Sequence, residues 1–93
     1  MMRVKRLRGV PPERQDRVRE CTRQAKRERG DKWERVKEHA RKSAGEQWWE
    51  PMLEYLTSGK SVGGIMMAYN MGSWKCVWMG LRNFYKTFPD DLL

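Results

Sequence analysis

The side chains in this sequence that are best suited to bind a ligand are cations spaced like one face of a helix. Lys75, Arg82 and Lys86 lie at positions i, i+7 and i+11, with Met79 between them at i+4. If this segment is helical, these side chains share one face. Lysine and arginine there have N–H donors for phosphate oxygens and for the acceptor edge of guanine. Cys76 and Met79 form few hydrogen bonds, so we expect phosphate contacts to dominate.

A second group of cations lies in the N-terminal half of the chain. Residues 1–46 carry the whole formal net charge of +8, because residues 47–93 hold equal numbers of basic and acidic side chains. Arg19, Arg23 and Arg27 recur at i+4 spacing, where like charges repel one another in an isolated helix. Phosphate is one group that would offset this repulsion. The one-sided charge favours a polyanionic partner, nucleic acid before acidic membrane, although it also fits a solvated helix face.

The apolar residues are distributed in the opposite way and indicate where the core lies. Twice as many of them follow residue 46 as precede it. We therefore expect one small domain with a basic tail over residues 1–11, a cationic helical pair over 12–46 and an apolar helical core over 47–93. No strand-like alternation occurs, so the sequence predicts an all-α fold of four to five helices.

Signals for helix ends subdivide the cationic half. Pro12 fits the first turn of a helix that runs to about residue 29, with Gly30 as its C-cap. Asp31 and Glu34 have the spacing of a capping box, which predicts the start of a second helix. Gly45 is expected to end that helix. The pair would present its charged faces to solvent or to a polyanion.

Residues 62–85 are apolar and rich in methionine and tryptophan, and two structures fit them. As one continuous helix they carry a ladder of small residues, which is typical of close helix packing, and residues 61–81 have about the length of a membrane span. The ladder consists of Gly64, Ala68, Gly72, Cys76 and Gly80. As two helices they bend near residues 70–73. A bend favours DNA binding, and a straight helix favours the packed or membrane-spanning alternative.

The same region carries the pattern of a known DNA-binding segment. Residues 52–65 fit the end of an amphipathic helix, a glycine that terminates it, and then Ser61 as the cap of the next helix. Asn70 fits a tight turn in which it takes the left-handed conformation. Residues 49–85 thereby resemble the helix-turn-helix segments of bacterial and phage regulators, transposases and small terminase-type proteins. Two registers of the turn fit comparably, and in one of them Ser73 caps the recognition helix.

This resemblance implies a C-terminal helix-turn-helix that contacts double-stranded DNA. Ser73 and Trp74 would face the groove at the start of the recognition helix, although helical spacing also places Trp74 with the core residues opposite the cationic face. Arginines of the first predicted helix would bind phosphates. The expected DNA-binding residues are Arg14, Arg17, Arg19, Arg23, Arg27, Lys60, Ser73, Trp74, Lys75, Arg82 and Lys86.

No catalytic, metal-binding or cofactor-binding pattern accompanies these cations. His39 is the sole histidine and lies among charged residues, so we expect it at the surface. Cys21 and Cys76 fit small buried or semi-buried residues better than nucleophiles. Residues 59–61 match the end of a phosphate-binding loop, but the first glycine of that motif is missing. We therefore expect no enzyme activity, no metal and no cofactor.

The sequence thus predicts a non-enzymatic protein that binds double-stranded DNA and regulates transcription in the cytoplasm of a bacterium or of a phage's host cell. Two alternatives stay open. The first is a single-span or helix-packing subunit of a large respiratory or ribosomal assembly. The second is a small phage-type inhibitor that binds a nucleic-acid enzyme. A homodimer, or membership of a larger protein or nucleoprotein complex, is left open as well.

Overall fold

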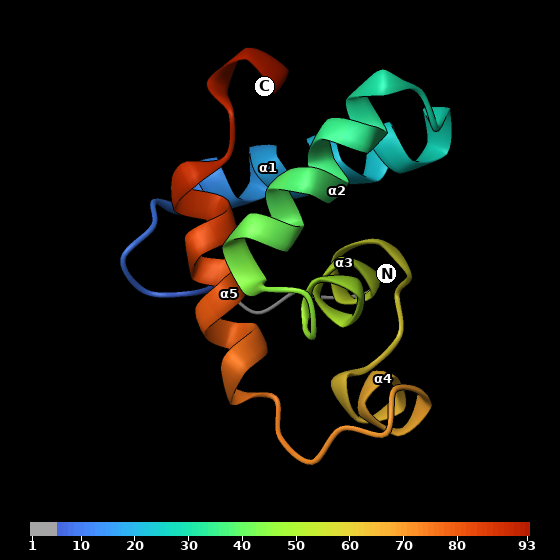
Figure 1. The fold of residues 1–93 in the computed structure, drawn as a ribbon. Helices are drawn as coiled ribbons and strands as arrows, with labels where there is room; N and C mark the ends of the chain where they lie inside the picture. The colour runs from blue at the N-terminus through green and yellow to red at the C-terminus, as the bar shows by residue number, and fades with distance from the viewer. Residues whose placement is uncertain (1–5) are drawn as a thin grey trace.

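The computed structural model describes residues 6–93, and these residues form helices joined by short loops, without a strand (Figure 1). The α-helices are α1 (Pro12–Glu28), α2 (Asp31–Ala44), α3 (Trp49–Thr57), α4 (Val62–Ala68) and α5 (Lys75–Thr87), and a 3-10 turn, η1, covers Asp90–Leu92. The predicted all-α class and the number of helices are confirmed. Figure 1 shows α2 crossing in front of α1, with α5 along one side and α4 set apart beyond α3.

The connection between α1 and α2 lies one residue earlier than the sequence predicts. Arg29, not Gly30, takes the left-handed conformation, with a φ of 52°, and its N–H donates to the carbonyl of Ala25 at 2.9 Å. Gly30 is already the extended N-cap of α2, whose first helical residue is Asp31. The predicted capping box is therefore wrong, because Asp31 lies inside the helix and no side chain caps its start.

The core lies where α2, α3 and α5 meet. Val36 and Ala40 of α2 are fully buried, as are Leu81 and Phe84 of α5. These residues lie on the apolar faces that helical spacing predicts.

The closest helix–helix contact joins the end of α2 to the middle of α5. A Cβ added to Gly80 would lie 2.6 Å from the Cβ of Ala44 and 2.8 Å from its Cα. Atoms cannot approach so closely, so this crossing requires glycine at position 80. One member of the predicted small-residue ladder thus serves close packing within a bent structure.

The chain before α1 packs against the domain from residue 6 onward. Gln15 is buried, and its Nε2 donates to the carbonyls of Leu7 at 2.7 Å and Val10 at 2.8 Å. Its Oε1 accepts the N–H of Leu7 at 2.9 Å. The described part of the predicted basic tail is thus fixed by one buried amide, while residues 1–5 of that tail lie outside the described part of the chain.

The chain after α5 folds back over α1. Arg14 of α1 donates from Nε to the carbonyl of Tyr85 at 2.8 Å and from Nη2 to the carbonyl of Phe88 at 3.1 Å. The thiol of Cys21 donates to the carbonyl of Leu92 at 3.1 Å. These bonds satisfy carbonyls at the end of α5 and in η1 that have no partner in a helix.

Residues 62–85 form two helices and not one. Ser61 caps α4 as predicted, since its Oγ accepts the N–H of Gly64 at 3.1 Å. After Ala68, Asn70 takes the left-handed conformation with a φ of 54°, and residues 69–74 lead into α5. The continuous helix is therefore wrong, and none of the helices within residues 6–93 has the length and apolarity to cross a membrane. α4 packs mainly against α3 and much less against α5.

Candidate anion-binding surfaces

The outer face of α5 is cationic and open. Lys75, Arg82 and Lys86 are exposed, as their spacing predicts, and none of them pairs with a carboxylate within residues 6–93. α5 contains no acidic residue. Met79 lies on the same face with 64% of its surface exposed. Because a large apolar side chain and unpaired cations share this face, it can receive a partner.

The start of α5 corrects one predicted contact. Trp74 is only 6% exposed, and its ring lies edge-on to Tyr55 and Trp78, with centroids 5.7 Å and 6.0 Å away. It cannot face a groove, because it shares the inner face of α5 with the buried core. Helical spacing alone predicts that Trp74 lies on the inner face of α5. Ser73 is exposed, and its Oγ accepts the N–H of Lys75 at 3.2 Å.

Several arginines predicted to bind phosphate form bonds within the protein. Arg14 donates to the carbonyl of Tyr85 at the end of α5 and also pairs with Asp90 at 3.1 Å. Arg19 pairs with Asp16 at 3.3 Å, and Arg23 donates to the carbonyl of Leu56 at 3.1 Å. The expected repulsion along α1 is thus offset by a carboxylate and by a helix end. Lys60 likewise pairs with Glu54, at 3.0 Å.

Other predicted residues of α1 remain available. Arg17 and Arg27 are exposed, and no hydrogen bond or ion pair occupies them within residues 6–93. Arg27 lines a pocket of about 370 Å³ at the adjoining ends of α1 and α3, which we call the cationic pocket. Its lining consists of Arg23, Lys26, Arg27, Arg29 and Thr57, with no carboxylate. The Nζ of Lys26 donates to the Oγ1 of Thr57 at 3.1 Å.

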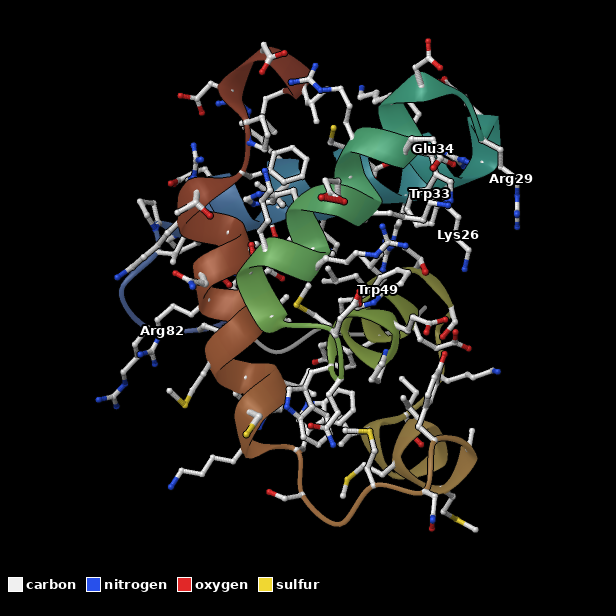
Figure 2. The ribbon with its side chains drawn as sticks, viewed as in Figure 1. Lys26, Arg29, Trp33, Glu34, Trp49 and Arg82 are labelled. Carbon is white, nitrogen blue, oxygen red and sulfur yellow. The ribbon has the colours of Figure 1, made fainter. Side chains whose placement is uncertain are left out.

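A second pocket, of about 250 Å³, shares Lys26 and Thr57 with the cationic pocket. Its walls include Trp33, Trp49 and Tyr69, and we call it the aromatic pocket. Figure 2 shows Lys26, Arg29 and Trp33 gathered on one side of the molecule and Arg82 on the other. The two pockets therefore face away from the cationic face of α5.

The aromatic pocket also carries carboxylates. Glu50 and Glu54 contribute to its lining, and the hydroxyl of Tyr69 donates to Glu54 at 3.4 Å. Burial, followed by the Glu54 and Glu50 charges, raises the pKa of Tyr69, which keeps this hydroxyl protonated. The guanidinium of Arg41 lies 4.6 Å from the centre of the Trp49 ring and covers one face of it.

A third hollow, of about 490 Å³, lies between the end of α2 and α5. Trp48, Cys76 and Met79 line it together with Arg82. Cys76 is exposed, contrary to the expectation from sequence, because the chain bends before α5 and leaves this part of the helix uncovered. The hollow directly adjoins the cationic face of α5.

His39 is half-buried rather than fully exposed, because it takes part in the contact between α2 and α5. Its ring packs on Phe84 and Phe88, with centroids 5.1 Å and 5.7 Å away. Its Nε2 lies 3.1 Å from the carbonyl of Phe84 and donates to it. Burial, opposed by this hydrogen bond and assisted by the charge of Lys42, lowers the pKa of His39.

Comparison with known proteins gives no family to which these surfaces could be assigned. No protein-family model matches the chain, and no curated protein or solved structure matches it significantly. Sequence reasoning missed the two pockets, since their residues come from three helices and two connecting segments. The cluster of cations near residue 29 is evident in the sequence, but no sequence pattern predicts that Thr57 lies beside it.

Proposed function

We propose that this protein binds double-stranded DNA without catalysing a reaction, with α5 as the helix that enters the major groove. The observation that carries the proposal is the unpaired cationic face of α5 directly after a bend at the left-handed Asn70. A helix presented in this way matches the resemblance of residues 49–85 to helix-turn-helix segments. The weak packing of α4 on α5 is the respect in which it departs from that pattern.

The dimensions of α5 suit a major groove. Lys75 and Lys86 are separated by eleven residues, or about 16 Å along a helix axis. The major groove is about 12 Å wide, so the two lysines can bind phosphates on its opposite walls. Arg82 lies between them and can donate to the O6 and N7 acceptors of guanine. Met79 offers an apolar contact to a thymine methyl group.

The proposed affinity rests mainly on phosphate contacts. Three lysine and arginine side chains that are not paired within the described chain release counterions when they bind a duplex, whereas few groups on this face read bases. Binding should therefore be strongly dependent on salt and weakly dependent on DNA sequence. Such a protein would act on transcription in the cytoplasm of a bacterium or of a phage's host.

A second candidate function is the binding of another protein by the same side of α5. The hollow lined by the partly buried Trp48 and the exposed Met79 favours it, because tryptophan and methionine next to arginine are typical of protein interfaces. A small inhibitor of a nucleic-acid enzyme would present such a surface. The alternative of a spanning helix loses its basis, since it required one continuous helix over residues 61–81.

The test is a titration of duplex DNA with Lys75→Ala and Arg82→Ala. Each substitution should weaken duplex binding about 5- to 150-fold and reduce the slope of log affinity against log salt by about 1 for each phosphate that is no longer bound. Arg27→Ala is the matched control, because it removes the same charge from the opposite side of the molecule. Equal weakening in all three variants would indicate diffuse attraction and not a recognition helix. Unchanged binding in all of them would leave protein binding as the better candidate.

A further inference from the structure

The cationic pocket has the composition of a phosphate-binding site. Four of its five lining residues are cations, and two of these are already held in place by bonds to α3, Arg23 through the carbonyl of Leu56 and Lys26 through Thr57. The side chains of Arg27 and Arg29 are exposed and form no hydrogen bond or ion pair within residues 6–93. A ligand that neutralises this pocket must bring several acceptor oxygens and negative charge, as a phosphate group does.

The aromatic pocket next to it suits a flat ring. Trp33 and Tyr69 contribute aromatic surface, and the carboxylates of Glu50 and Glu54 accept hydrogen bonds. Carboxylates would repel a phosphate, and they lie only in this pocket, not in the cationic one. The paired pockets therefore fit a ligand with an anionic end and a planar end that carries N–H donors.

A nucleotide has both ends. Its phosphate matches the cationic pocket, and the exocyclic amino group of adenine, cytosine or guanine can donate to a carboxylate while the base packs on an aromatic ring. A base paired and stacked inside a duplex is inaccessible to such a pocket, whereas an unstacked base of a single strand can enter it. Single strands are bound by this combination of cationic groove and aromatic surface.

We propose that the paired pockets bind one nucleotide of a single nucleic-acid strand, with the phosphate at Arg27 and Arg29 and the base against Trp33 and Tyr69. This second site goes beyond duplex binding by α5. The two sites face opposite ways, as Figure 2 shows for Arg29 and Arg82, so a duplex on α5 does not cover the pockets. A protein with both surfaces would hold a duplex and an adjoining single strand together.

The experiment compares four probes on the intact chain: a short single strand of mixed bases, an abasic strand of the same length, a mononucleotide and pyrophosphate. Tryptophan fluorescence or an anisotropy label reports binding. The mixed strand should bind about 5- to 150-fold more tightly than the abasic strand for each base that stacks. Tighter binding of the mononucleotide than of pyrophosphate is also expected. Equal affinity for the mixed and abasic strands would overturn the proposal.

Variants separate this site from the proposed duplex site. Arg27→Ala combined with Arg29→Ala should weaken strand binding at least about tenfold and weaken duplex binding much less than Arg82→Ala does. Tyr69→Ala, at a partly exposed ring, should weaken binding of the mixed strand but not of the abasic strand. Arg82→Ala is the control and should leave strand binding unchanged. If Arg82→Ala weakens strand binding as much as the double variant does, the pockets are not the site. If duplex binding alone is absent, only the proposed function fails.

Discussion

Helices α1 and α5 are both basic, yet they use their cations differently. On α1, Arg14 binds carbonyls at the end of α5, and Arg23 binds the carbonyl of Leu56 at the end of α3. On α5, Lys75 and Arg82 have no such partner within the described chain. The difference comes from position, because α1 crosses two helix ends where free carbonyls concentrate negative partial charge. The net charge of a sequence therefore overstates the charge that a ligand can reach.

The largest effect should come from the inner face of α5. Trp74→Ala removes a buried ring at the junction of α3 and α5, and we expect it to lower the free energy of unfolding by about 3–5 kcal/mol. Duplex affinity per folded molecule should stay the same. Urea unfolding combined with titration of the folded fraction measures both. Lys75→Ala, at the next residue, is the control and should change stability by less than about 0.5 kcal/mol. A stable Trp74→Ala variant with weakened duplex binding would show that Trp74 contacts the DNA groove.

A smaller effect should follow from removing the hydrogen bonds by which Arg14 joins α1 to the end of α5. Arg14→Met keeps the aliphatic stem but removes the hydrogen bonds to Tyr85 and Phe88, so we expect stability to fall by about 2–3 kcal/mol. Arg17→Met, at an exposed position on the same helix, should change stability by less than about 0.5 kcal/mol. If Arg14→Met has an unchanged free energy of unfolding but binds duplex DNA weakly, Arg14 is a ligand contact and the contrast between α1 and α5 fails.

The smallest expected effect concerns pH at the same end of α5. The lowered pKa of His39 means that the unfolded state takes up a proton at a higher pH than the folded state does. His39 therefore contributes its full stability above its unfolded pKa of about 6.5, and this stability falls as the pH drops below that value. Thermal melts between about pH 5 and pH 8 should show a decline that His39→Gln reduces. An identical pH profile for the variant would assign the decline to other groups.

Much of the fold follows from local signals in the sequence. The apolar spacing places Val77 and Leu81 inward, the serine at 61 caps α4, and an asparagine at 70 allows the left-handed turn that ends it. These features depend only on neighbouring residues. The left-handed Arg29 was missed, because the tight connection to α2 sets its conformation against the usual preference for glycine.

The interactions between helices could not be predicted in this way. The burial of Gln15 depends on a backbone segment that folds back over it, and the burial of His39 depends on Phe84 of a helix 45 residues away. The same holds for the candidate sites, since the cationic pocket needs the end of α3 beside the end of α1. The cationic face of α5 was predictable, because all of its residues belong to one helix.

The bonds from Arg14 also bear on how the chain folds during synthesis. Its partners Tyr85 and Phe88 follow it by 71 and 74 residues, so the ribosome adds them several seconds later at about 5–20 residues per second. Until then α1 lacks the carbonyls that hold it, and its repelling arginines disfavour an isolated helix. Contacts of such long separation slow folding, because a large loop must close first. We expect the docking of α1 to be a late step, completed only when the last turn of α5 has left the ribosome.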